Sequence, residues 1–194
     1  MYKCGFISLV GKPNVGKSTI LNSLIGQKVS IVSDKPQTTR QNIIGILNNE
    51  DYQMVFVDTP GIHDSKNKLD SYMNKNIKKA LEGVDVLALV VDAKELTKKI
   101  DFDFISSFSG YNIPLILLIN KIDLVTYEKL YPVIEKLSKL SYINEIIPIS
   151  GLKNKNVDVL ERAILNYLPE VPKENAFYDK DELLINPLSF YVKK

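Results

Sequence analysis

Short apolar runs alternate with stretches of helical spacing along most of the chain. The runs are rich in Ile, Val and Leu, as is typical of buried strands, and they lie at residues 6–10, 42–47, 52–57, 84–91, 114–119 and 145–149. Apolar residues recur every three or four positions at residues 18–25, 69–81, 100–108, from Pro132 to residue 140, and at 157–168. This alternation predicts an α/β fold, with a mostly parallel six-stranded sheet and helices on both faces.

Three segments depart from the alternation. The runs at 42–47 and 52–57 are separated only by a polar turn, which predicts a hairpin and hence one antiparallel strand in the sheet. Residues 27–41 are polar and have no period, so we expect a long surface loop of functional importance. The three prolines and scattered charges of residues 169–187 predict a linker.

Composition and charge narrow the class of protein. The 194 residues, 45% of them hydrophobic, support the core of one domain, and a net charge of +2 gives little long-range attraction to nucleic acid. Cys4 is the only cysteine, so an intramolecular disulfide is impossible and a reducing, cytoplasmic location is expected. No apolar run approaches the roughly 18 residues of a membrane span, and the chain enters its first strand too early for a secretory signal.

Residues 11–18 match the phosphate-binding motif G-x-x-x-x-G-K-S/T and lie between an apolar run and a helical stretch, as that motif requires. The glycines allow backbone N–H groups to surround an anionic oxygen, and the N-terminus of the helix adds a partial positive charge. Lys17 can then reach the β- and γ-phosphates, and Ser18 can hold Mg²⁺. The alternative is a flexible loop that happens to contain glycine and lysine.

Two later motifs follow strands of the predicted sheet. Residues 58–61 read Asp-Thr-Pro-Gly, and a carboxylate at Asp58 can order magnesium and its water, although such a sequence also forms plain turns. Residues 120–123 read Asn-Lys-Ile-Asp at the sheet edge where α/β proteins bind ligands. The carboxylate of Asp123 can accept from the N1–H and 2-amino groups of guanine, whereas adenine lacks that donor pattern. Asn120 can bond the base edge and tie loops together, and the stem of Lys121 can lie on the ring; a helix-capping aspartate is the alternative.

These motifs, together with Gln-Thr-Thr-Arg at residues 37–40, resemble those of the Era family of bacterial GTPases, within the translation-factor-like P-loop GTPases. The resemblance covers residues 5–192. It implies that Thr39 joins Mg²⁺ when a γ-phosphate is present, and that the backbone of Gly61 donates to that phosphate. It also implies that the N–H after Ser150 contacts guanine O6, although Gly151 stands where the family usually has alanine.

The motifs and the resemblance together imply three sets of site residues. The catalytic set is Lys17, Asn14, Thr39 and Gly61. The nucleotide-binding set is Gly11, Asn14, Val15, Gly16, Lys17, Ser18, Thr19, Asp58, Gly61, Asn120, Lys121, Asp123, Ser150 and Gly151. The magnesium set is Ser18, Thr39 and Asp58.

The resemblance also implies a domain organisation. A GTPase domain is expected at residues 1–168, followed at 169–194 by a linker and the start of a C-terminal KH-type RNA-binding domain. KH domains hold RNA with a G-x-x-G loop, and no glycine follows Gly151, so we expect that domain to be missing from this chain. The implied partners are a guanine nucleotide and, through the missing domain, the small ribosomal subunit and its rRNA. The chain is expected to be monomeric, and a peripheral membrane association stays open.

The expected function is that of an Era-type switch protein in small-subunit assembly, which binds GTP or GDP with Mg²⁺ and hydrolyses GTP with water. Ile62 replaces the water-positioning glutamine of Ras-like enzymes. His63 is a neighbouring candidate base, but as the only histidine, in a loop, it is interpreted as a solvated switch residue. Related loops use an asparagine to hold a monovalent cation, so K⁺ beside Asn14 is a further expectation. Three alternatives remain: a nucleotide-dependent binding module with negligible hydrolysis, an ATP-dependent enzyme, and direct RNA binding through Lys75, Lys78 and Lys79.

Overall fold

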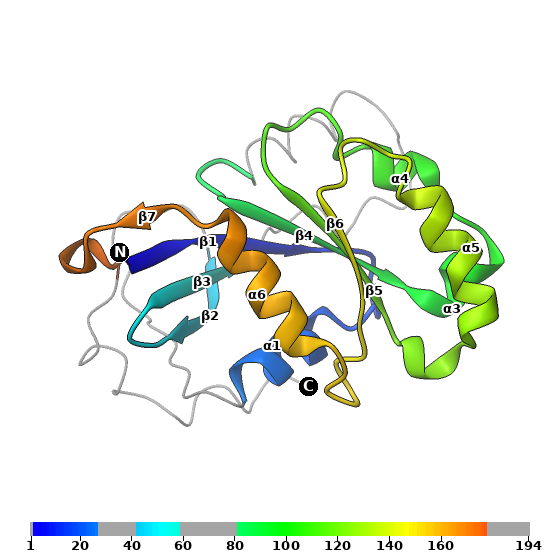
Figure 1. The fold of residues 1–194 in the computed structure, drawn as a ribbon, viewed down its shortest axis with the longest axis horizontal. Helices are drawn as coiled ribbons and strands as arrows, with labels where there is room; N and C mark the ends of the chain where they lie inside the picture. Colours follow the sequence, from blue (N-terminus) through cyan, green and yellow to red (C-terminus); the bar gives the residue numbers. More distant parts are fainter. Residues whose placement is uncertain (1, 27–41, 59–80, 178–194) are drawn as a thin grey trace.

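The structure, a computed structural model, describes residues 2–26, 42–58 and 81–177, and these form one twisted sheet with helices packed on it (Figure 1). The strands are β1 (Tyr2–Val10), β2 (Asn42–Asn48), β3 (Tyr52–Asp58), β4 (Val86–Asp92), β5 (Leu115–Asn120), β6 (Glu145–Pro148) and β7 (Glu170–Val171). Their order is β2-β3-β1-β4-β5-β6, and β7 pairs with β1 outside this path. β3, β1, β4, β5 and β6 run parallel, and β2 is antiparallel to β3. The predicted six-stranded α/β sheet is confirmed, with β7 as an addition.

The hairpin of β2 and β3 is closed by an asparagine. Asn49 Oδ1 accepts from the N–H of Asp51 at 2.8 Å and from the N–H of Tyr52 at 2.9 Å. This local hydrogen bonding is the reason that asparagine favours turns. The polar turn predicted from the sequence therefore lies where it was expected.

The helices are α1 (Lys17–Ile25), α3 (Ala93–Lys98), α4 (Phe102–Ser106), α5 (Tyr127–Leu137) and α6 (Val157–Tyr167), with short 3₁₀ turns η1 (Ile122–Leu124) and η2 (Lys173–Asn175). Along β4, Val86, Ala88 and Val90 pack in one buried cluster with α1 and α6, while Leu87 and Leu89 pack in another with α3, α4 and α5. Successive strand residues point to opposite faces, so one apolar run serves both layers. In Figure 1, α6 crosses one face of the sheet above α1, and α3, α4 and α5 gather beside β5 and β6.

Two helices differ from the sequence prediction. We expected a helix to begin near Pro132, but α5 begins at Tyr127 and contains Pro132 in its second turn. The proline removes one backbone hydrogen bond, and the burial of Leu130, Val133 and Leu137 against the sheet offsets that loss. The stretch at 100–108 contains only the short α4, and α3, which no pattern predicted, precedes it.

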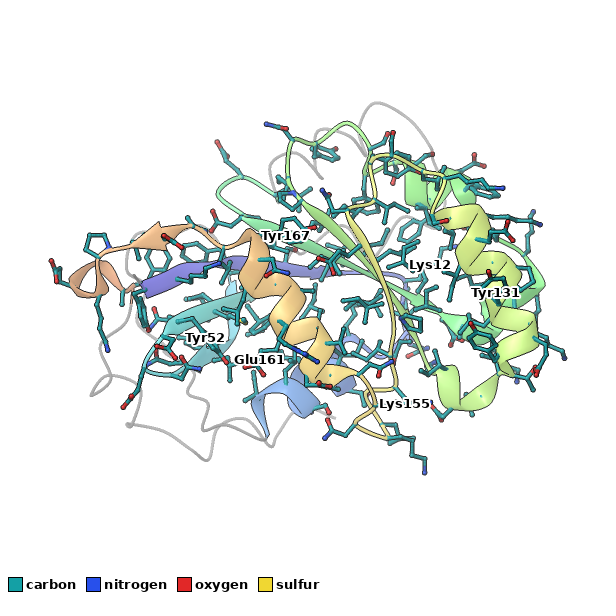
Figure 2. All side chains as sticks on the ribbon, in the orientation of Figure 1. Lys12, Tyr52, Tyr131, Lys155, Glu161 and Tyr167 are labelled. Atoms are coloured by element: carbon teal, nitrogen blue, oxygen red, sulfur yellow. The ribbon has the colours of Figure 1, made fainter. Side chains whose placement is uncertain are left out.

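The first residues of the segment interpreted as a linker lie against the domain. Glu170 and Val171 pair with Lys3 and Tyr2, and the Phe177 ring lies 4.5 Å from the Phe6 ring, centroid to centroid. A separate hydrogen bond joins β3 to α6, where the Tyr52 hydroxyl donates to Glu161; Figure 2 shows the two side chains next to each other. Within the described ranges, no helix combines the length and the apolar character needed to cross a membrane.

Candidate nucleotide-binding site

The loop between β1 and α1 has a backbone that side chains would obstruct. A Cβ on Gly11 would lie 2.4 Å from the Val90 carbonyl oxygen, and a Cβ on Gly16 would lie 2.3 Å from Asn120 Nδ2. Gly16 also has a φ of 96°, in the left-handed region that favours glycine. Asn14 has a φ of 63°, which asparagine tolerates better than most residues. The loop is therefore held in one curved shape by close backbone packing.

Lys17 folds back over this loop at the start of α1. Its Nζ donates to the carbonyl oxygens of Gly11 at 2.8 Å and Lys12 at 3.0 Å. Gly16, the N-cap of α1, carries no side chain, so the first N–H groups of the helix face the loop without a side-chain cap. Ser18 and Thr19 are exposed in the first turn. A positive ammonium, helix N–H groups and an exposed hydroxyl thus surround one concave loop, which suits a phosphate chain.

Asn120 joins three loops at the end of β5. Its side chain is buried; Nδ2 donates to the Val15 carbonyl at 2.8 Å and Oδ1 accepts from the Gly151 N–H at 3.1 Å. One amide therefore links the phosphate loop, the loop after β5 and the loop after β6. In this structure the Gly151 N–H donates to Asn120. The contact of this N–H with guanine O6, which the resemblance implies, stays a prediction.

Asp123 lies in η1 and is oriented by a buried serine. Ser150 Oγ donates to Asp123 Oδ1 at 2.5 Å and accepts from the Lys153 N–H at 3.1 Å. Ser150 is fully buried whereas Asp123 is exposed, so the carboxylate is fixed from behind and presented outward. An oriented, exposed carboxylate can accept two parallel N–H donors, which is the pattern that guanine offers.

Close packing against α1 explains why a glycine fits at position 151. A Cβ there would lie 3.0 Å from both the backbone N and Cγ1 of Ile20, and 3.1 Å from its Cα. Ile20 is a fully buried residue of α1. Glycine, in place of the alanine that is usual in the Era family, therefore allows this loop to lie close against α1.

Residues 120–123 are called the base-reading motif below. Lys121 of this motif contacts the phosphate loop, and Asp92 holds its ammonium there. Lys121 Nζ donates to the Asn14 carbonyl oxygen at 2.6 Å and to Asp92 Oδ2 at 2.6 Å. Burial tends to raise the pKa of Asp92, but hydrogen bonds from Lys121 and from the Lys94 N–H hold that pKa below its usual value. Asp92 was not predicted as a site residue. The only signal in the sequence is an acidic residue at the end of an apolar run.

A cavity of about 890 Å³ lies between the phosphate loop, the end of β4 and α3–α4, and Asp92 and Lys121 are among the residues that line it. At its wall, Lys12 pairs with Asp101 and its Nζ lies 5.2 Å from the centre of the Phe104 ring. Lys12 is labelled in Figure 2. These contacts tie the phosphate loop to α4 and its N-cap.

Several predicted site residues lie outside the described residues: Thr39, Gly61, Ile62, His63 and the lysines at 75, 78 and 79. The backbone of Asp58 ends β3, which pairs with β1. Within the ranges that the structure describes, no three His, Cys, Asp or Glu side chains form a metal site. The expected magnesium set contains one carboxylate and two hydroxyls, and of these side chains only Ser18 lies within the described part.

A family model described as "50S ribosome-binding GTPase" matches residues 6–121, more than half of the chain. GTPase Era of Clostridium botulinum strain Hall is 44% identical over 188 residues, which is 95% of this chain and 64% of the relative. The chain therefore spans less than two thirds of that relative's length.

Solved structures of Era have the same fold. Era in complex with MgGDPNP and nucleotides 1506–1542 of 16S ribosomal RNA has a TM-score of 0.67 and 39% identity, covering 89% of this chain and 59% of that one. A variant of Aquifex aeolicus Era bound to GDP·AlF4⁻ has a TM-score of 0.70 and 38% identity, covering 95% of this chain and 62% of that one. The resemblance seen in the motifs is confirmed: the chain belongs to the family of 50S ribosome-binding GTPases and is an Era-type G domain.

Proposed function

We propose that this chain binds GTP and GDP and hydrolyses GTP with water to GDP and phosphate. The observation that carries the proposal is the buried Asn120 amide, which joins the phosphate loop to the loops that hold Asp123 and Ser150. A molecule that fills both ends must carry a phosphate chain and a base with two adjacent donors. Guanine meets that requirement, and adenine does not, which disfavours an ATP-dependent enzyme.

Each residue has a defined part in this reaction. The Lys17 ammonium, which lies over the phosphate loop, holds the β- and γ-phosphates, and the first N–H groups of α1 stabilise the charge that develops on the transferred phosphoryl group. The exposed hydroxyl of Ser18 fits Mg²⁺, with Thr39 and Asp58 as its further ligands. When bound, Mg²⁺ neutralises charge on the phosphate oxygens.

Single-turnover hydrolysis of GTP tests this proposal. The unmodified chain is compared with Lys17→Ala and with Lys129→Ala, a matched change at an exposed lysine of α5. We expect Lys17→Ala to lose at least about 100-fold in rate, by analogy with the loss of one oxyanion donor, and Lys129→Ala to be unchanged. Tight GTP binding without turnover by the unmodified chain would instead support the nucleotide-dependent binding module.

We further propose that K⁺ supports hydrolysis beside Asn14. The side chain of Asn14 is exposed on the phosphate loop, and its backbone carbonyl is already held by Lys121. Turnover in K⁺ and in Na⁺ at matched ionic strength is compared for the unmodified chain and for Asn14→Ala. Faster turnover in K⁺ that Asn14→Ala abolishes supports the proposal, and equal turnover in both salts refutes it.

At the level of the whole protein, we propose an Era-type role in assembly of the small ribosomal subunit, in the cytoplasm. The similarity to an Era structure that contains 16S ribosomal RNA supports this role. We propose the GTPase domain at residues 1–168, a linker and the start of a C-terminal KH-type RNA-binding domain at 169–194, and the principal rRNA contact on that KH-type domain. We propose that this chain acts as a monomer. A peripheral membrane association stays a further proposal, and no residue of the chain is assigned to it.

RNA binding measured at fixed salt tests this division. The chain is compared with a longer version that continues past Lys194 with the corresponding segment of the C. botulinum relative. We expect the longer version to bind the 16S rRNA fragment far more tightly. Equal affinity would place the RNA site within the G domain.

A further inference from the structure

Asp92 serves two partners with its two carboxylate oxygens. Oδ1 accepts from the Lys94 N–H at 2.8 Å and so caps α3, whereas Oδ2 accepts from Lys121 Nζ at 2.6 Å. The first contact stabilises the start of α3. The second reaches a residue of the base-reading motif, and no motif in the sequence assigns Asp92 a part in it.

The Lys121 ammonium is held at two points on different segments. Asp92 and Asn120 are paired neighbours across β4 and β5, and Lys121 directly follows that pair in a left-handed conformation with a φ of 65°. Of its three donors, one goes to Asp92 and one to the Asn14 carbonyl of the phosphate loop. Two fixed points on the ammonium restrict the direction of the carbon stem, which is the part that can lie against a flat base.

We propose that Asp92 is a positioning residue for guanine nucleotide binding, which acts by holding the Lys121 ammonium. The inference rests on the proposed function, because it needs a guanine nucleotide in the site. The side chains of Lys121 and Asp92 are 32% and 16% exposed, so solvent screens this pair less than an ion pair on the open surface. Without Asp92 the ammonium keeps one protein partner, and the stem is free to leave the base.

Asp101 provides a matched control within the same protein. It caps α4 in the same way, with Oδ1 accepting from the Phe104 N–H at 3.1 Å, and its Oδ2 pairs with Lys12. This pair is more exposed, at 46% for Asp101 and 55% for Lys12, and Lys12 belongs to the phosphate loop and not to residues 120–123. The two aspartates thus share a capping role and differ in the lysine that they hold.

The test compares Asp92→Asn with Asp101→Asn. Asparagine caps helices as well as aspartate does, so both variants keep the cap and lose the charge, and at position 92 an amide N–H then faces Lys121. The rate of release of a fluorescent GDP analogue is measured, with the thermal midpoint of each variant. We expect release to be about 10-fold faster for Asp92→Asn and less than about twofold faster for Asp101→Asn, because the less exposed charge pair contributes more to residence time.

A double-mutant cycle with Lys121→Met separates positioning from a general effect on the fold. If Asp92 acts through Lys121, Asp92→Asn changes release by less than about twofold when Lys121→Met is already present. An undiminished effect in that background, equal effects at positions 92 and 101, or no effect of Asp92→Asn overturns the inference. If Asp92→Asn does not fold, Asp92→Ser keeps a cap without placing an N–H donor against Lys121.

The same assay separates this inference from the proposed function. A chain whose unmodified form does not bind the GDP analogue refutes the proposed function and the inference together. An unmodified chain that binds GDP tightly, with Asp92→Asn releasing it at the same rate, refutes the inference alone.

Discussion

The phosphate end of the candidate site is shaped by closely packed backbone, whereas the base end is held in place by side-chain hydrogen bonds. The phosphate loop owes its shape to Gly11 and Gly16, where any Cβ would collide with Val90 or Asn120. The base end is a chain of side-chain hydrogen bonds from buried Ser150 to Asp123 and from buried Asn120 to two backbone groups. A phosphate is recognised by any well-placed N–H groups, but a base is recognised by a particular pattern of donors and acceptors.

The comparison implies that the two ends fail in different ways. Adding a methyl group should destroy the phosphate end, because there is no space for it. Exchanging one polar atom for another should leave the base end folded and change which base it accepts. The following predictions run from the largest expected effect to the smallest.

Gly16→Ala should abolish nucleotide binding. The new Cβ would lie 2.3 Å from Asn120 Nδ2 at a φ of 96°, so both the loop and the Asn120 amide must move. We expect the affinity for GDP to fall by more than about 100-fold, which corresponds to about 3 kcal/mol. Titration with a fluorescent GDP analogue measures it.

Gly110→Ala is the control for this change, because a Cβ there meets no atom within 4 Å. It should bind GDP as the unmodified chain does. Tight binding by Gly16→Ala would show that the loop tolerates side chains and would remove the contrast between the two ends.

Asp123→Asn should exchange specificity for guanine with specificity for xanthine. An amide at this position donates to the C2 carbonyl of xanthine and no longer accepts from the guanine 2-amino group. Hydrogen bonds to a charged group are worth about 1.5–3 kcal/mol, so GDP should weaken by about 10- to 100-fold while the xanthine nucleotide gains.

Competition between the two nucleotides measures this exchange. Asp158→Asn, at an exposed aspartate of α6, should change neither affinity. If Asp123→Asn weakens both nucleotides equally, Asp123 does not recognise the base.

Ser150→Ala should weaken guanine nucleotides without altering the preference for guanine. The change removes the donor to Asp123 and leaves the Lys153 N–H without its acceptor, at a cost of about 1–2 kcal/mol in the free energy of unfolding. Because the carboxylate loses its orientation but keeps its charge, we expect the affinity for GDP to fall by about 10-fold.

Urea unfolding and GDP titration give the two quantities for Ser150→Ala. Ser138→Ala, at an exposed C-cap of α5, is the matched control. Unchanged GDP affinity together with a lower free energy of unfolding would restrict Ser150 to a structural part.

Gly151→Ala should have the smallest effect. The new Cβ would lie 3.0–3.1 Å from atoms of Ile20, so α1 has to move by only a few tenths of an ångström. We expect the affinity for GDP to change by less than about threefold, which is below about 1 kcal/mol. A loss as large as that of Gly16→Ala would mean that the base end is constrained by space as tightly as the phosphate end.

The sequence predicted the parts of the molecule that depend on local patterns. The buried strands follow from apolar runs, and the phosphate loop and Asn120–Asp123 follow from motifs whose spacing requires them at the same edge of the sheet. Helix α3 was not predicted because only Ala93 and Leu96 of its six residues are buried, too few to produce a period.

The remaining differences depend on contacts between distant segments. The position of α5 depends on burial that outweighs the local preference of Pro132. Asp92 and Lys121 are brought together by the pairing of β4 with β5, and β7 is a two-residue strand that pairs with the start of β1. The pattern of residues along the chain does not predict such pairings between distant segments.

The pairing of β7 with β1 determines where the chain departs from the sheet. Glu170 and Val171 contact Lys3 and Tyr2, at the start of a nine-residue strand whose other end enters the phosphate loop. Nine residues of strand span about 30 Å. Residues 170–177 are therefore anchored along the first five residues of this strand, from Tyr2 to Phe6, whereas the phosphate loop follows its last residue. A signal between Phe177 and the phosphate loop has to travel along the second half of β1 or pass through other segments of the domain.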